Sequence, residues 1–175
     1  VVNNPVSAYD YLGLACGWAV GLCKRNLFWP PCPSQITISI LGKTITVPIP
    51  KWVQNAVDNT KLTHHDAKAV ACKSKCAKGA CQGEIESETV KGFFAKDVGE
   101  AVMQKALDLV GKSPSNGWVD GEVRDSAASA GACAMQCVGE ARYNTVIQRM
   151  GTLTPTRYKL TDYTCQTYAS EVLAP

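Results

Sequence analysis

Long hydrophobic runs, histidine and several common catalytic motifs are scarce or absent in this chain of 175 residues. The longest apolar stretch, LGLACGWAVGLC, has about twelve residues, whereas a membrane-spanning helix needs roughly twenty, so no transmembrane segment is expected. Neither a phosphate-binding P-loop, nor the helical two-histidine zinc motif, nor the serine nucleophile elbow is present. The chain has two histidines, His64 and His65, so any imidazole chemistry depends on this pair.

Charge is also modest. The chain has 18 basic and 15 acidic residues and a net charge of +3. Its densest basic run, KAVACKSKCAKG, distributes the lysines over several faces of a predicted helix, so no nucleic-acid partner is expected. Hydrophobic residues make up 46% and charged residues 19%, which is typical of a globular domain.

Local patterns favour a mainly α fold with one small β-hairpin (α+β), its helices cross-linked by cysteines. The β-branched runs ITISI and TITVPI flank a turn at Leu41–Lys43 and predict the hairpin. Thr63 and Asp66 have N-cap spacing, which predicts a helix from His64 or His65 to about Lys78. Apolar spacing predicts further helices over 90–110, over most of 119–150 and from about 163 to 173, with a loop or short strand between the last two.

Nine cysteines form an odd set, and two pairs share i, i+4 spacing: Cys72 with Cys76, and Cys133 with Cys137. On two antiparallel helices these pairs could form two disulfides, Cys72–Cys137 and Cys76–Cys133. A zinc site is the alternative, although C-x₃-C is not the usual zinc spacing, and buried free thiols are the third possibility. The remaining cysteines before residue 100 could form two more bridges: Cys16, Cys23, Cys32 and Cys81. So many cysteines indicate an oxidising, extracytoplasmic destination.

Cys165 is left over by this pairing. It follows Thr161, Asp162 and Thr164, all N-cap types, so it should lie in the first turn of the last helix, where free N–H groups stabilise a thiolate. We predict Cys165 as nucleophile and His65 as base, with His64 as the other candidate, because His65 shares a face of its predicted helix with Cys72 and Cys76. Asp66 or Asp162 could orient the imidazole. No cofactor or catalytic metal is expected.

The segment CQTYASEVL resembles the nucleophile helix of permuted papain-like (NlpC/P60-type) hydrolases, in which a cysteine late in the chain precedes an aromatic and a small residue. Cys165, Tyr168 and Ala169 match that pattern, and the histidines lie upstream, as in that family. Thr164 stands where asparagine is frequent, and the resemblance implies a histidine at the start of a strand. It implies thiol-dependent hydrolysis.

The first fourteen residues, VVNNPVSAYDYLGL, resemble the closing segment of an Rhs-repeat (YD-repeat) core. Asn4-Pro5-Val6 and the segment 10–14 occupy the places of two family motifs, with Tyr11 where proline is commoner. The resemblance implies cleavage after Leu14, which would separate the core shell of a longer parent chain from a C-terminal toxin domain at residues 15–175. It further implies secretion or delivery into a target cell, interbacterial competition and a cognate immunity protein.

The sequence therefore predicts the toxin domain of an Rhs-type polymorphic protein, in which a Cys–His pair hydrolyses an amide or ester of a target-cell protein or peptide. The alternative is a non-enzymatic, disulfide-stapled helical module that binds a protein partner or a membrane surface. A nuclease is a third option, which the modest charge does not favour.

Overall fold

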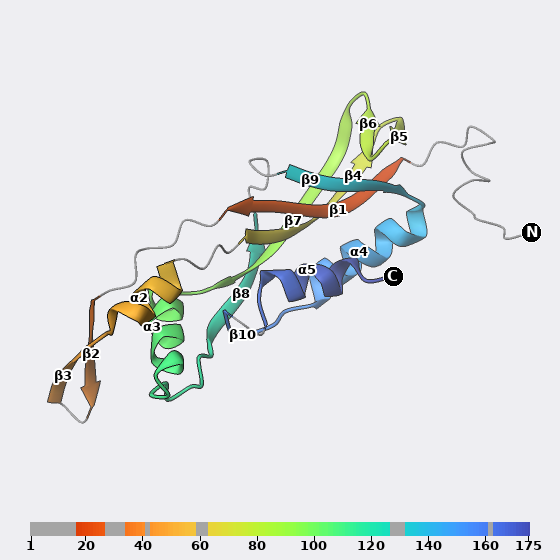
Figure 1. The fold of residues 1–175 in the computed structure, drawn as a ribbon. Coiled ribbons are helices and arrows are strands. Elements are labelled where there is room, and N and C mark those ends of the chain that lie inside the picture. Colours follow the sequence, from red (N-terminus) through yellow and green to blue (C-terminus); the bar gives the residue numbers. More distant parts are fainter. Residues whose placement is uncertain (1–16, 27–33, 41–42, 59–62, 127–131, 161–162) are drawn as a thin grey trace, which may run out of the picture.

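The computed structural model describes residues 17–26, 34–40, 43–58, 63–126, 132–160 and 163–175. The predicted Rhs-like segment 1–14, Cys16, Cys32 and Asp162 lie outside the described residues. The described residues form ten strands and four helices (Figure 1): β1 (Trp18–Asn26), β2 (Gln35–Ile40), β3 (Lys43–Pro48), α2 (Lys51–Asp58), β4 (Thr63–Cys72), β5 (Lys75–Ala77), β6 (Ala80–Gln82), β7 (Ile85–Ala95), α3 (Val98–Leu109), β8 (Val119–Asp125), β9 (Ala132–Val138), α4 (Glu140–Thr152), β10 (Arg157–Tyr158) and α5 (Cys165–Leu173).

Six strands form one antiparallel sheet in the order β10-β8-β7-β4-β1-β9. Strand β4 is central and pairs with β1 on one side and β7 on the other. The pairing places Arg25 of β1 opposite His64 of β4, and Asp66 of β4 opposite Gly92 of β7. Residues of three strands thus lie side by side around the first residues of β4.

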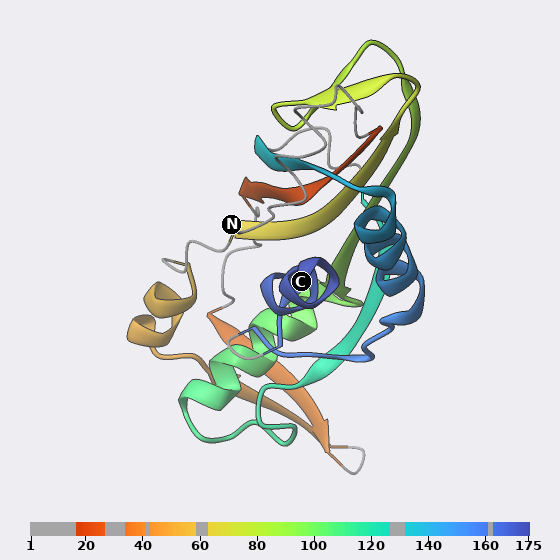
Figure 2. The same ribbon diagram turned by 90° about the vertical axis from the view of Figure 1, so that its right-hand side faces the viewer.

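Helices α4 and α5 cover one face of this sheet (Figures 1 and 2). The main core forms between the sheet and these helices, because the apolar residues of one face of each strand point toward them. Ala67 and Ala69 of β4, Phe93 of β7, and Tyr168 and Val172 of α5 are fully buried in it. The small alanines allow α5 to pack closely against β4.

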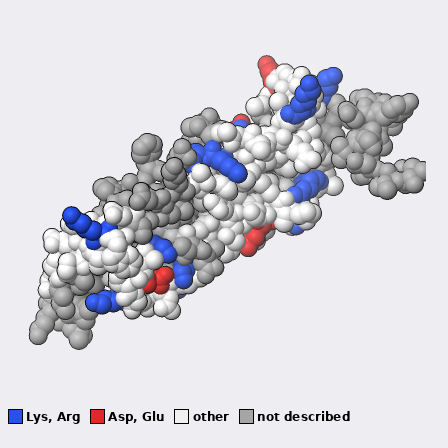
Figure 3. All heavy atoms as spheres, viewed as in Figure 1, with Lys and Arg blue, Asp and Glu red and all other residues white. Residues whose placement is uncertain are grey.

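A smaller apolar cluster joins α2 to α3 and contains Ile49, Val53, Val102, Ala106 and Leu107. The predicted hairpin over residues 35–48 is confirmed, since β2 and β3 pair antiparallel from Gln35–Pro48 to Ile40–Lys43. None of the four described helices has the length and apolar character that crossing a bilayer requires. On the face shown in Figure 3, lysine and arginine form several small separate groups.

The predicted mainly α fold class is wrong, because strands dominate the described residues and form the six-stranded sheet. The largest error concerns the segment from His64 to Lys78, which forms β4 and the hairpin β5–β6 instead of a helix. In β4 both faces are buried, so its near-continuous small and apolar residues mimic a helical pattern. The N-cap spacing of Thr63 and Asp66 has no role there.

Two other predicted helices are also partly strand. Residues 85–95 form β7, and the expected helix begins only at Val98, where the Asp97 side chain accepts a hydrogen bond from the Glu100 N–H. In the region 119–150, β8 and β9 precede the helix α4. The short strand β10 and the final helix α5 agree with the prediction. Phe93 and Phe94 resemble helical spacing in sequence but point to opposite faces of β7.

The structure contains the disulfides Cys23–Cys133, Cys72–Cys81 and Cys76–Cys137. The predicted rungs Cys72–Cys137 and Cys76–Cys133 are therefore wrong, and so is their placement on helices. Cys133 and Cys137 lie on the strand β9, where i and i+4 residues are about 13 Å apart, so each reaches a different partner. Because Cys72, Cys76, Cys133 and Cys137 are all bridged, their thiolates are not available for the alternative zinc site.

Candidate active site

The last helix begins at Cys165. Thr164 caps it: the Thr164 hydroxyl accepts a hydrogen bond from the Gln166 N–H at 3.2 Å, and the Thr167 side chain accepts one from the Thr164 N–H. Cys165 is therefore the first helical residue, as predicted, and its own N–H has no carbonyl partner within the helix. Its side chain is 3% exposed, and it is the free cysteine among the described residues.

We predict that alkylation mapping of the unreduced, denatured protein labels Cys165 and none of the six bridged cysteines. The physical reason is that only a reduced sulfur reacts with an alkylating reagent. The measurement is peptide mass spectrometry after labelling with iodoacetamide, and a reduced sample in which all the cysteines are labelled is its control. An unlabelled Cys165 would contradict the assignment.

His64 lies at the start of β4, next to Cys165. Its Nε2–H donates a hydrogen bond of 2.7 Å to Oδ1 of Asp66, and both side chains are almost completely buried. The Cys165 thiol is one of the groups that raise the pKa of this imidazole, and Nδ1 is the ring nitrogen that is not bonded to Asp66. The thiol also contacts the carbonyl oxygen of Thr63 at 3.9 Å. The imidazole is thus hydrogen-bonded to the carboxylate and electrostatically coupled to the thiol.

The electrostatic surroundings of His64 favour its protonated form. Burial by itself would lower the pKa of His64, but the hydrogen bonds to Asp66 and Cys165 and the negative charges of these groups outweigh it. The pKa of His64 is consequently raised above the ordinary value of 6.5. An imidazole of this kind readily accepts a proton from a neighbouring thiol.

His65, which the sequence favoured as base, is placed differently. It points to the other face of β4, because successive side chains of a strand alternate. Its Nε2 lies 3.2 Å from the Thr63 hydroxyl, and burial together with the positive charge of Lys24 lowers its pKa. Cys165 is among the groups that raise the pKa of His64 and is not among those that shift the pKa of His65, so His64 is the histidine coupled to the thiol.

The carboxylate that orients the imidazole is Asp66, one of the two sequence candidates. It lies two residues after His64 and so shares its face of the strand. Gly92, opposite Asp66, is essential to this arrangement: a Cβ at residue 92 would clash with Asp66 Oδ1 and lie 2.8 Å from His64 Nε2. The ring of Phe94 stacks on the imidazole at 4.2 Å between centroids.

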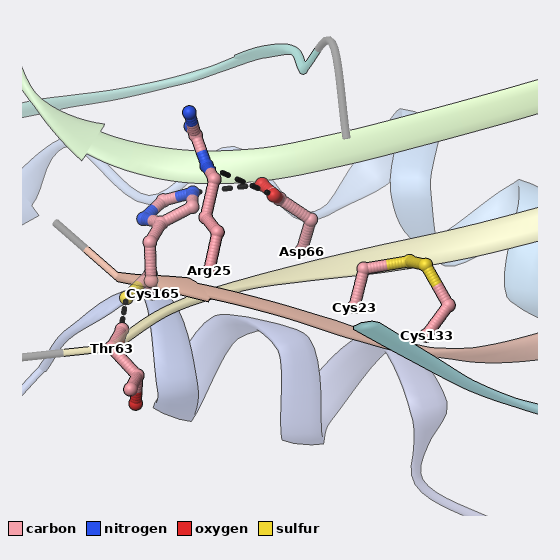
Figure 4. A network of polar contacts seen from close by, with 7 residues as sticks. Cys23, Arg25, Thr63, Asp66, Cys133 and Cys165 are labelled. Carbon is pink, nitrogen blue, oxygen red and sulfur yellow. Dashed lines mark hydrogen bonds and ion pairs between the residues drawn. A yellow bond between two sulfur atoms is a disulfide. The ribbon is translucent and has the colours of Figure 1, made fainter. Parts of the chain in front are cut away.

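Figure 4 shows Arg25, Asp66 and the disulfide Cys23–Cys133 on the side of β1 and β4 that faces away from α5. Cys165, at the start of α5, contacts the carbonyl oxygen of Thr63, the first residue of β4. Burial, together with the charge of Cys165, raises the pKa of Tyr158 on β10, so its hydroxyl remains protonated. Sequence reasoning missed Arg25, Gly92, Phe94 and Tyr158, because only the strand pairing brings them to the histidine.

The chain matches no protein-family model, no curated protein and no solved structure. The chemistry of the site therefore follows from its own side chains. Among the described residues no group of three or more histidine, cysteine, aspartate or glutamate side chains is arranged to hold a metal ion. The site offers a free thiol, a buried histidine whose pKa that thiol raises, and a carboxylate hydrogen-bonded to the histidine.

Proposed function

We propose that the protein is a thiol hydrolase of amide or ester bonds, with Cys165 as nucleophile, His64 as general base and acid, and Asp66 as the group that orients His64. The observation that carries the proposal is that the His64 imidazole is hydrogen-bonded to the Asp66 carboxylate and coupled to the Cys165 thiol, which itself lies at the Thr63 carbonyl beside His64. A cysteine hydrolase requires this order of groups, because the base must reach the nucleophile while a third group fixes its tautomer.

The reaction would follow from these positions. His64 Nδ1 takes the thiol proton, and Sγ attacks the substrate carbonyl carbon, whose electron pair moves to its oxygen. The tetrahedral intermediate collapses to a thioester on Cys165, and the amine or alcohol leaves with the proton from His64. A water molecule then gives a proton to His64 and adds to the thioester, so that the carboxylic acid and the free thiol are released.

The negative oxygen of each tetrahedral intermediate needs hydrogen-bond donors. The Cys165 N–H is suitable because it is adjacent to the nucleophile and, at the first helical position, has no acceptor within the helix. The Gln166 N–H, in contrast, is already bonded to the Thr164 hydroxyl. The hydroxyl of Tyr158, which stays protonated because burial and Cys165 raise its pKa, is a second donor to test.

Two features support kinship of mechanism with permuted papain-like hydrolases. Cys165 begins a helix, with Tyr168 and Ala169 fully buried one turn later, and His64 begins a strand, the location that this resemblance implies for the histidine. The three disulfides support an extracytoplasmic place of action. Action as a delivered Rhs-type toxin on a target-cell protein or peptide, opposed by an immunity protein, rests on the resemblance of residues 1–14 alone.

The test uses p-nitrophenyl acetate as a minimal ester. We expect release of nitrophenolate together with a transient acetyl group on Cys165, because acylation precedes hydrolysis. Intact-mass and peptide mass spectrometry detect the adduct, and Cys165→Ala should remove both the adduct and the turnover. Equal ester hydrolysis by the Cys165→Ala protein, or an adduct on another residue, would contradict the proposal.

The second candidate is a non-enzymatic, disulfide-stapled binding module. The low exposure of Cys165, 3%, favours it, because a substrate carbonyl must reach Sγ. In that case Cys165 would be only a core residue, and native protein would resist both acylation and alkylation at this position. Reaction of the native protein at Cys165 therefore distinguishes the two functions.

A further inference from the structure

Asp66 is a buried carboxylate with one oxygen that lacks a hydrogen bond. Its side chain is 1% exposed; Oδ1 accepts the hydrogen bond from His64, and Oδ2 has no hydrogen-bond partner. A buried negative charge is costly unless a positive charge lies near it. If His64 were the only such group, the carboxylate would hold the imidazole in its charged form and oppose its turnover as a base.

Arg25 supplies a second positive charge. Its Nε lies 3.6 Å from Asp66 Oδ2, and this nitrogen is itself buried without a hydrogen-bond partner. Arg25 is also directly opposite His64 in the pairing of β1 with β4. Figure 4 shows Arg25 and Asp66 joined across the two strands. The two orphaned groups, Oδ2 and Nε, thus face each other as an ion pair beside the base.

Phe94 holds this group of side chains together. The guanidinium of Arg25 lies 5.7 Å from the centroid of the Phe94 ring, and the guanidinium of Arg124 lies 4.7 Å from the same centroid. Arg124 differs from Arg25 because its Nε pairs with Glu122 at 3.1 Å and its Nη2 donates to the Ala95 carbonyl. Arg124 therefore has the same aromatic neighbour but no ion pair with Asp66, which makes it a matched control.

Several charged or titratable groups surround His64, and they come from four strands and one helix. Asp66 lies on β4, Arg25 on β1, Arg124 with Glu122 on β8, Tyr158 on β10 and Cys165 on α5. Phe94 of β7 adds an uncharged ring, and Lys24 influences His65 instead. Of the cations in this set, Arg25 is the one that faces the carboxylate bonded to His64.

We propose that Arg25 is a positioning residue of the active site: its cation balances the charge of Asp66, so that His64 can release and regain its proton during catalysis. The proposal rests on the proposed function of Cys165 and His64. While His64 is neutral, the charges of Arg25 and Asp66 cancel each other. When His64 takes the proton from Cys165, the only new charges are those of the His64 imidazolium and the Cys165 thiolate. Loss of the Arg25 cation would leave Asp66 uncompensated and strengthen its hold on the imidazolium.

The experiment measures the pKa of His64 by NMR titration of its imidazole in the full chain. Two histidines give two titrating signals, and a His65→Asn variant assigns them. We expect Arg25→Gln to raise the pKa of His64 by about one unit. At an effective dielectric of about 20, removal of one unit charge from a neighbouring side chain has an effect of that order. Arg25→Lys, which keeps the charge, should leave it within about 0.3 units.

Arg124→Gln should likewise leave the pKa of His64 within about 0.3 units. Arg25→Met, which keeps the apolar stem, replaces Arg25→Gln if the latter does not fold. Equal shifts for Arg25→Gln and Arg124→Gln, or no shift in Arg25→Gln, would overturn the proposal.

The titration does not depend on hydrolysis, so the two proposals fail separately. If the protein shows no hydrolysis but Arg25→Gln gives the expected shift, the effect of Arg25 on the pKa of His64 stands and only the proposed hydrolase activity is refuted. If hydrolysis depends on Cys165 but Arg25→Gln does not shift the pKa of His64, only the proposed role of Arg25 is refuted. Where ester turnover is present, Arg25→Gln should also move the pH profile of kcat, whereas loss of a mere substrate contact would raise KM alone.

Discussion

Replacement of His64 by asparagine should reduce Cys165-dependent ester hydrolysis by about 10³-fold, whereas His65→Asn should change it by less than about threefold. In the His64→Asn protein the new amide could still bond to Asp66 but could not accept the thiol proton, so the nucleophile would lose its base. His65 points to the other face of β4, and asparagine there can keep a hydrogen bond to the Thr63 hydroxyl. The measurement is the initial rate of nitrophenolate release at neutral pH.

The adjacent histidines make this comparison unusually well controlled, since both variants carry the same chemical change on the same strand. Near-ultraviolet circular dichroism should be unchanged in both, which separates loss of the base from loss of the fold. Equal losses of ester hydrolysis in the two variants would refute the assignment of His64 as the base. A larger loss for His65→Asn would instead identify His65 as the base, as the sequence predicts.

Gly92→Ala should disturb the site and the fold together. The new Cβ would overlap Asp66 Oδ1 and lie 2.8 Å from both His64 Nε2 and Phe94 Cε2, so the His64–Asp66 pair could not keep its place. We expect a loss of hydrolysis of about 100-fold and a decrease in the free energy of unfolding of about 1–3 kcal/mol, as for other overpacked positions. Ester assays and urea unfolding measure the two effects.

Gly151→Ala is the matched control for this change. Gly151 lies in α4, and a Cβ there would meet no atom within 4 Å. This substitution should leave hydrolysis unchanged and increase the free energy of unfolding by about 0.5–1 kcal/mol, because alanine is the better helix former. A Gly92→Ala protein that behaves like Gly151→Ala would show that the close approach of β7 to Asp66 is not needed.

The sequence predicted the features that depend on local chemistry. The β-branched runs around residues 41–43 specify a hairpin, and Thr164 specifies the start of the last helix, so β2–β3 and α5 agree with expectation. Cys165 is free, as expected, although the disulfide pairing that left it over is wrong. The hairpin and the last helix needed only turn residues and capping residues, and neither needed knowledge of the sheet.

The features that depend on long-range pairing could not be predicted in this way. Strand β4 is buried on both faces, so its three alanines and single valine lack the alternation that marks an exposed strand. Once it was assigned as a helix, the face shared with Cys72 favoured His65, and the disulfide pairing followed the same error. On a strand, His64 and Asp66 share a face, and the register of β4 with β1 and β7 adds Arg25 and Gly92.

The most direct measurement of the central claim is the pKa of His64 with and without the thiol. The Cys165 thiol raises the pKa of His64, so in the wild-type protein His64 should titrate above 6.5. Cys165→Ser, which removes the ionisable sulfur, should lower that pKa by about half a unit or more and leave His65 unaffected. An unchanged pKa of His64 in the Cys165→Ser protein would mean that the thiol and the imidazole do not interact.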